Sequence, residues 1–362
     1  MPLETPLLEL HTSTGAAAGE YFGTLLPSRF ADFASEYKAL RETVGLIDSN
    51  YRAFFSFTEA DRQRYVNAIL TSNVRDLKPG QGTVGLLLNP QGHILAEVET
   101  FLLERSLLAS CHAMIRERTF ATFDKFIIMD DVTLEDVTAS TGTLDIAGPR
   151  VAQLLTRMGI DNFADMPLFA HAEFSLGAIP FRLVRRELGG ESAAMIIVAR
   201  EHLAELWQEL EKRVRAEGGA PVGMEALNSV RLESGVAWFG HDYDDRQIPH
   251  EAGLELSHIS YEKGCYTGQE IVERVRSRGH ANRRLAELKF PVDEAAAADT
   301  KLIFAGNEIG SVTSSGFSPI LGQPIGLGYV RREHSAVGTQ LNASGIPAEV
   351  IAPPRPSKKM SA

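Results

Sequence analysis

Residues 263–270 read KGCYTGQE and place a cysteine between two glycines, with a lysine before it. Cys265 is one of two cysteines in the chain, and the glycines permit tight or positive-φ backbone around it. Apolar residues at helical spacing from Gln269 on predict a short helix beginning near Thr267 or Gly268, with its free N–H groups facing the Cys265 loop. These surroundings, with Lys263 nearby, favour thiolate over thiol and predict a reactive cysteine. A half-buried cysteine beside a glycine turn is the structural alternative, and the residues alone leave both open.

A basic run follows directly, in the segment ERVRSRGHANRR. Its basic residues are Arg274, Arg276, Arg278, His280, Arg283 and Arg284. In a chain of formal net charge −11, this local excess could receive an anionic ligand or an RNA backbone. A solvated helix face or strand is the alternative. The overall negative charge and the lack of interleaved aromatic residues disfavour direct nucleic-acid binding.

A third candidate is the carboxylate of Glu233, in the segment NSVRLESGVAWFG. The spacing of apolar residues predicts a helix that breaks at Gly235, so Glu233 would lie just before the break among apolar neighbours. A carboxylate there is costly unless it is paired. Glu233 could accept from adjacent N–H donors of a ligand, or it could form an internal salt bridge with Arg231.

These segments together resemble the YgfZ family of folate-binding proteins, which are relatives of the glycine cleavage T-protein. KGCYTGQE resembles the signature of that family, and its cysteine is a residue that T-proteins lack. Residues 70–95, 228–254 and 309–330 are similar to three further segments of T-proteins and their relatives. The resemblance covers roughly residues 30–355.

The resemblance implies an α+β fold, with T-protein-like domains in a ring around a central folate cavity and a small C-terminal antiparallel β-barrel. It implies tetrahydrofolate as the cofactor, with Glu233 accepting the paired N–H groups of the pterin. Cys265 takes the catalytic position. The further cofactor-binding residues that it implies are Lys263, Tyr266, Gly268, Gln269, Glu270, Arg283 and Glu97.

Two departures separate this chain from T-proteins. The Asp-Asp doublet that follows the hairpin strand of T-proteins corresponds here to Ala96-Glu97, and residues 187–194 lose a tyrosine and a Gly-Phe-Glu segment. The resemblance therefore implies a tetrahydrofolate-binding protein that supports iron–sulfur cluster assembly or repair, with client enzymes, including tRNA-modifying enzymes, and assembly proteins as partners. A folate-dependent aminomethyl- or methyltransferase, in which Glu97 replaces the missing aspartate, is the alternative.

The elements that must position these residues can be read from periodicity. The pattern predicts helices over 29–48 and 199–219 and a hairpin turn at 89–92. It predicts strand–turn–helix units at 53–70 and 142–159, which indicate a duplicated α+β domain or a chance similarity. Short strands separated by turn residues predict a barrel after residue 283. We therefore expect an N-terminal segment (1–28), a folate-binding region (29–283), a barrel (284–354) and a disordered tail (355–362).

Composition limits the class of protein. The chain has 362 residues, of which 44% are apolar and 23% charged, as in globular proteins. No stretch approaches the roughly 20 apolar residues of a membrane helix, and the acidic start lacks the features of a secretory signal. Two cysteines exclude a disulfide framework and a four-thiolate metal site. We therefore expect a cytoplasmic protein with free thiols and no resident metal.

Overall fold

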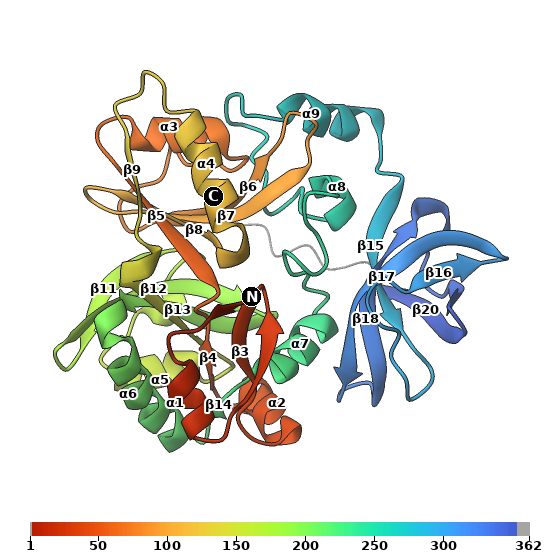
Figure 1. Cartoon of the computed structure of the whole chain (residues 1–362), viewed down its shortest axis with the longest axis horizontal. Coiled ribbons are helices and arrows are strands. Elements are labelled where there is room, and N and C mark those ends of the chain that lie inside the picture. Colours follow the sequence, from red (N-terminus) through yellow and green to blue (C-terminus); the bar gives the residue numbers. More distant parts are fainter. Residues whose placement is uncertain (1, 353–362) are drawn as a thin grey trace. The chain divides into compact units, whose positions relative to one another are not determined.

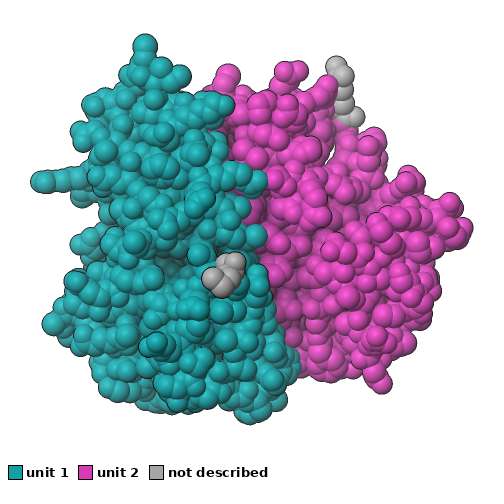
Figure 2. Space-filling view, viewed as in Figure 1, with its two compact units in different colours: residues 1–68, 73–84, 98–227 teal, residues 69–72, 85–97, 228–362 magenta. Residues whose placement is uncertain are grey.

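The computed structural model describes residues 2–352, apart from the side chain of Arg278. The predicted tail and the last two residues of the predicted barrel region lie outside the described residues. Two compact units divide the chain (Figure 2). Unit 1 comprises residues 1–68, 73–84 and 98–227, and unit 2 comprises residues 69–72, 85–97 and 228–362.

Unit 1 contains two large sheets with the strand orders β11-β12-β13-β10-β4-β14 and β6-β7-β8-β5-β9 (Figure 1). The strands of the first are β4 (Gly45–Asp48), β10 (Thr141–Ala147), β11 (His171–Leu176), β12 (Ile179–Leu188), β13 (Glu191–Ala199) and β14 (Ala220–Pro221). Those of the second are β5 (Arg52–Thr58), β6 (Gly82–Leu88), β7 (Ile94–Leu102), β8 (Leu107–His112) and β9 (Thr133–Asp136). Residues 85–88 of β6 and 94–97 of β7 belong to unit 2.

Helices cover these sheets. They are α2 (Phe33–Glu42), α3 (Arg62–Ile69), α4 (Arg116–Lys125), α5 (Val151–Arg157) and α6 (Leu203–Ala216). The apolar stripe predicted for α6 is buried in one core with the six-stranded sheet; its members are Leu203, Leu206, Trp207, Leu210 and Val214. The prediction of a core helix is confirmed, with its start four residues later than expected.

The helix predicted over 29–48 is confirmed only for residues 33–42. Helix α2 ends at Glu42, and β4 follows and pairs with β10. A Cβ on Gly45 would lie 2.8 Å from the side chains of Leu40 and Val222, so the chain passes there as a closely packed strand. Every residue of β4 is buried, and an apolar run this short does not distinguish helix from strand.

Residues before this helix form a small sheet of their own, for which the pattern predicts no structure. Its strands are β1 (Leu3–Glu4), β2 (Ala17–Tyr21) and β3 (Thr24–Arg29), in the order β1-β3-β2, with α1 (Leu8–Ser13) between β1 and β2.

Unit 2 ends in a closed barrel with the strand order β15-β18-β17-β16-β19-β20 (blue in Figure 1), as predicted. Its strands are β15 (Arg283–Lys289), β16 (Lys301–Phe304), β17 (Asn307–Ser318), β18 (Gln323–Arg331), β19 (Gln340–Ala343) and β20 (Ile346–Ala352). Neighbouring strands are antiparallel, and the barrel has an apolar core that includes Leu288, Phe290, Val312 and Val350.

The helices nearest the barrel in sequence are α7 (Met224–Glu233), α8 (Pro249–Ala252) and α9 (Gln269–Arg278). Helix α7 crosses the division between the units and ends before Gly235, which has φ 65°, as the pattern predicts.

Candidate functional site

The KGCYTGQE loop is anchored by its lysine. Lys263 is buried, and its Nζ donates hydrogen bonds to the carbonyl oxygens of Leu70 and of Ser72, the latter at 3.1 Å. The same ammonium lies 5.2 Å from the ring centroid of Tyr266, a favourable cation–π geometry. Backbone carbonyls and an aromatic ring thus stabilise a cation that burial would otherwise disfavour. Lys263 therefore fixes the loop to residues 70–72.

Glycine fixes the other end of the loop. Gly268 precedes α9 with φ 83°, and a Cβ there would lie 2.6 Å from the carbonyl oxygen of Asn89. A Cβ on Gly92 would lie 2.9 Å from the Ile271 side chain. The first turn of α9 therefore packs closely on the hairpin turn between β6 and β7, which only glycine permits at these two positions.

The two thiols have opposite environments. Cys265 is exposed, whereas Cys111 is buried. Burial raises the pKa of the Cys111 thiol to about 12. The half-buried cysteine considered from the sequence is therefore not what the structure shows at position 265. Of the predicted residues that follow, Gln269 is half-buried and Glu270 is exposed in the first turn of α9.

A second group of polar side chains gathers at Glu97 on β7. The Tyr243 hydroxyl donates to Glu97 Oε2, and His258 Nε2 lies 3.3 Å from the same oxygen. His258 Nδ1 in turn lies 2.7 Å from the Ser257 hydroxyl. Burial and the adjacent Glu97 raise the pKa of Tyr243 well above its ordinary value, so Tyr243 stays a donor to the carboxylate. The side chain of Glu97 is only 20% exposed, and these partners hold it in one orientation.

Glu233 does not form the internal salt bridge considered from the sequence. Its Oε1 accepts hydrogen bonds from the Ser318 hydroxyl at 2.5 Å and from the Ile320 backbone N–H at 3.1 Å. Arg231 instead pairs with Asp242 at 2.6 Å, with both side chains fully buried. The binding of a pterin by Glu233 remains a prediction.

Asp242 joins the loop after α7 to the barrel. Besides Arg231, it accepts from the hydroxyls of Thr313 at 2.6 Å and Ser314 at 2.5 Å, and from the Trp238 backbone N–H at 2.9 Å. This buried charge is fully paired. Asp242 and Tyr243 lie in the segment HDYDD, which directly follows the apolar run VAWFG. This abrupt change to acidic residues was the sequence signal that could have identified both as candidate site residues.

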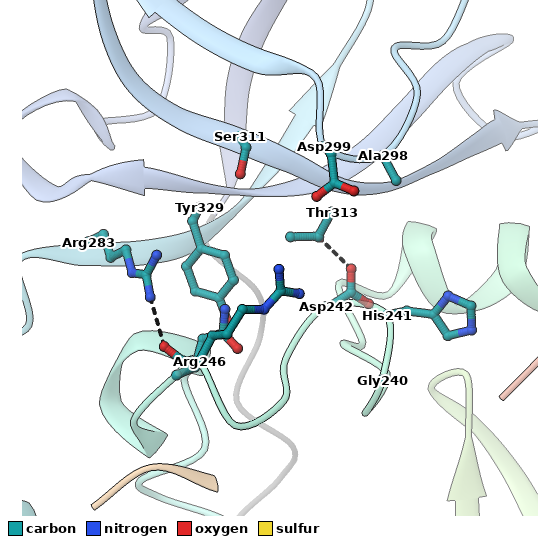
Figure 3. Close-up of a pocket in the computed structure, with 11 residues that line it drawn as sticks. Gly240, His241, Asp242, Arg246, Arg283, Ala298, Asp299, Ser311, Thr313 and Tyr329 are labelled. Carbon is teal, nitrogen blue, oxygen red and sulfur yellow. Dashed lines mark hydrogen bonds between the residues drawn. The ribbon is translucent and has the colours of Figure 1, made fainter. Parts of the chain in front are cut away.

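Arg283, the remaining predicted residue, lines a pocket against the barrel, as Asp242 does (Figure 3). Its Nε donates to Glu251 at 2.9 Å. The predicted site residues thus belong to unit 2 but fall into four groups: the cysteine loop, the Glu97 group, Glu233 with the 318–320 turn, and the Arg283 pocket. Tyr243, His258 and Ser257 were missed from the sequence.

Two further properties bear on function. Within residues 2–352, no group of three or more His, Cys, Asp or Glu side chains could hold a metal ion. No helix in that part of the chain has the length and apolar character needed to cross a membrane.

Comparison with known proteins identifies similar chains. Residues 7–259 match the model of the GCVT N-terminal domain, and residues 283–355 match that of the glycine cleavage T-protein C-terminal barrel domain. The aminomethyltransferase of Rippkaea orientalis is 27% identical over 348 residues, covering 94% of this chain and 92% of that protein. The aminomethyltransferase of Nostoc sp. is 28% identical over 362 residues, covering 97% and 94%. The crystal structure of glycine cleavage system aminomethyltransferase T from Bartonella henselae has the same fold, with a TM-score of 0.86, 23% identity and 98% coverage of both chains.

Proposed function

Because the chain belongs to the glycine cleavage T-protein family, we propose that it binds tetrahydrofolate and transfers a one-carbon unit of the aminomethyl type to that cofactor. The relatives are named aminomethyltransferases, which supports this activity over a role in iron–sulfur cluster assembly. The departures at Ala96-Glu97 and residues 187–194 had instead favoured the iron–sulfur role. Tetrahydrofolate, when bound, would supply the nitrogen that accepts the carbon as a methylene group, and the amino group of the donor would leave as ammonia.

The observation that carries the proposal is the environment of Glu97. T-proteins have an acidic doublet at this hairpin, and here the acid that remains is held by Tyr243 and lies beside His258. A largely buried carboxylate with a fixed orientation is suited to accept a proton from, or return one to, a reacting nitrogen. In this proposal Glu97 is the acid–base group, and Tyr243 and His258 are positioning residues.

Calorimetric titration with tetrahydrofolate tests the first half of the proposal. We expect wild type to bind, and we expect Glu97→Gln, which keeps the shape of the side chain, to bind with similar affinity. Glu262→Gln, which alters an exposed carboxylate of the same unit, is the matched control. A wild type that gives no heat of binding and no thermal stabilisation by tetrahydrofolate would refute the proposal.

One observation favours a second function. Cys265 is an exposed thiol on a loop that Lys263 anchors, in a motif that resembles the YgfZ signature. We therefore propose, as the alternative, that the folate-bound protein supports iron–sulfur cluster assembly or repair in client enzymes, including tRNA-modifying enzymes, with Cys265 as the reactive group. Within residues 2–352, no group of three or more His, Cys, Asp or Glu side chains could hold a metal ion, so in this alternative the iron–sulfur cluster would belong to the client enzyme.

Complementation of a cell that lacks its own YgfZ-type protein tests this alternative. Rescue by wild type and by Cys111→Ser, but not by Cys265→Ser, would support it. Equal rescue by all three would exclude Cys265 as the reactive group.

A further inference from the structure

A continuous line of hydrogen-bonding groups connects Glu97 to a hydroxyl nearer the surface of unit 2. His258 Nε2 lies 3.3 Å from Glu97 Oε2, and His258 Nδ1 lies 2.7 Å from the Ser257 hydroxyl. His258 is buried, with 8% of its surface exposed, whereas Ser257 is half-buried. The imidazole ring therefore contacts the carboxylate with one nitrogen and a group closer to solvent with the other.

The backbone that carries the imidazole ring is fixed. The Thr71 hydroxyl donates to the His258 carbonyl oxygen at 2.6 Å, and the His258 backbone N–H donates to the Leu254 carbonyl at 3.0 Å. The Ser260 backbone N–H donates to the Thr71 carbonyl at 2.9 Å. All of these residues belong to unit 2, as Glu97 does. Because both ring nitrogens also have partners, the ring is held in one orientation.

The partners of the ring assign its hydrogen to one nitrogen. Glu97 Oε2 also accepts from the Tyr243 hydroxyl, so this oxygen acts as an acceptor, as an ionised carboxylate does. Nε2 of a neutral His258 therefore carries the hydrogen and donates to Glu97, and Nδ1 accepts from the Ser257 hydroxyl. All the hydrogens of this line then point from Ser257 toward Glu97.

Such an arrangement can conduct a proton from solvent to the carboxylate. A proton from solvent joins the Ser257 oxygen as Ser257 passes its own to His258 Nδ1, and the Nε2–H bond breaks as that proton joins Glu97. His258 changes tautomer but stays neutral, so no charge is left on the buried ring. The path reaches Glu97 through the protein, so it stays open when a ligand covers the carboxylate.

We infer that Ser257 and His258 form a proton relay, which loads Glu97 with the proton that the departing amino group takes up. The inference rests on the proposed function, in which Glu97 is the acid–base group. Loaded Glu97 gives its proton to the amino nitrogen as the bond between that nitrogen and the carbon breaks, and ammonia leaves.

The return of the proton completes the cycle. The Glu97 carboxylate accepts one of the two N–H protons that tetrahydrofolate loses when the methylene group forms, and the other goes to the donor atom that gives up the carbon. The relay then passes the proton from Glu97 back to solvent, and His258 regains its original tautomer.

The cofactor-free protein tests the direction of the relay. Nitrogen-15 NMR of histidine side chains reports which ring nitrogen is protonated, and His258→Gln assigns the resonances. We expect His258 to be neutral with its hydrogen on Nε2, both in wild type and in Ser260→Ala, a control that removes another half-buried hydroxyl of this segment. A hydrogen on Nδ1, in a neutral or a charged ring, would overturn the inference, because Nδ1 could not then accept from Ser257.

Transfer kinetics test whether the relay is used. We expect Ser257→Ala and His258→Gln to bind tetrahydrofolate as wild type does but to transfer the carbon about tenfold or more slowly, because Glu97 is loaded less readily. Ser257→Thr keeps a hydroxyl and should transfer at close to the wild-type rate, as should Ser260→Ala.

The outcomes separate the relay from the proposed function. If Ser257→Ala and His258→Gln transfer at the wild-type rate, the relay is overturned and the proposed function stands. If Ser257→Thr is as slow as Ser257→Ala and both lose unfolding free energy, Ser257 is only structural and the relay is again overturned. A wild type that binds tetrahydrofolate without transfer refutes the proposed transfer activity, and the relay that serves it fails with it.

Discussion

Two cysteines of the same chain show how strongly the environment decides what a thiol can do. Cys265 is exposed, while Cys111 is buried on β8 with its pKa raised to about 12. A thiol that stays protonated and out of contact with solvent is chemically inert. Of the two cysteines, only Cys265 in the KGCYTGQE loop is therefore placed to react.

Alkylation of the native protein should distinguish the two thiols. We expect iodoacetamide to modify Cys265 and to leave Cys111 intact until denaturant is added, because Cys111 is sealed by its neighbours. Mass spectrometry of the alkylated peptides measures this, and the Cys265→Ser variant should remain unmodified while folded. Comparable native modification of both cysteines would contradict the structure.

At the scale of elements, the packing of α9 on the β6–β7 turn depends on two glycines. Gly268 needs both its positive φ and the absence of a Cβ, because the Asn89 carbonyl lies where that Cβ would be. Gly253, at the end of α8, also has a positive φ of 74° but has open space around it. Alanine substitutions at these two glycines can therefore be compared: both introduce the strain of a positive φ, and only the one at Gly268 adds a steric contact.

We expect Gly268→Ala to lower the free energy of unfolding by more than Gly253→Ala does. A left-handed conformation costs a residue with a Cβ about 1–2 kcal/mol, and at Gly268 the contact with Asn89 adds to that cost. Urea unfolding of both variants measures the difference. Equal losses of unfolding free energy would mean that α9 does not pack on the turn as described.

His171 on β11 makes part of the stability of unit 1 dependent on pH. Burial and Arg182, whose Nη1 lies 2.9 Å from His171 Nδ1, lower the pKa of His171 from 6.5 to about 4. Between these values the unfolded chain binds a proton that the folded chain does not.

The free energy of unfolding should therefore fall as pH decreases from 6.5 toward 4, by up to about 3 kcal/mol from this group. His171→Gln removes the titrating group, whereas carboxylates titrate in both proteins. Urea unfolding across this range should show a shallower loss in the variant. If the free energy of unfolding fell equally steeply with pH in wild type and in His171→Gln, His171 would not be the source of this pH dependence.

Sequence patterns predicted those elements whose signals are local. The stripe of α6, the Asn89–Gly92 turn and the barrel strands each carry their periodicity or turn residues within a short segment. The strand β4 was missed because its identity comes from pairing with β10, nearly a hundred residues later in the chain.

The candidate site was predicted less completely for the same reason. The hydrogen-bond partners of Glu233 lie 85 and 87 residues away, and Tyr243 is 146 residues from Glu97. The residue types suggested a paired carboxylate and an acid at the hairpin. Only the fold shows which groups pair with them.

At the scale of the whole molecule, short segments of the N-terminal half belong to unit 2. Residues 69–72 accept hydrogen bonds from Lys263 and from the Ser260 backbone N–H, and the backbone N–H of Ile94 donates to the Gln247 carbonyl at 3.0 Å. The barrel, by contrast, closes on its own core.

A fragment of residues 228–362 should therefore fold only in part. We expect its barrel amides to stay protected from hydrogen exchange and those of residues 240–270 to exchange much faster than in the full chain, because their partners are missing. Hydrogen exchange of the fragment beside the full-length protein measures this. Full protection of residues 240–270 in the fragment would show that the hairpin contacts are dispensable.

Single-turnover transfer of the carbon of an aminomethyl donor to tetrahydrofolate, with release of ammonia, is the most direct test of the proposed activity. Wild type should form methylenetetrahydrofolate and ammonia, and Glu97→Gln should be slower by about 100-fold or more while still binding the cofactor, because the acid–base group is lost. Wild type that binds tetrahydrofolate without transfer, or Glu97→Gln that transfers at the wild-type rate, would contradict this account.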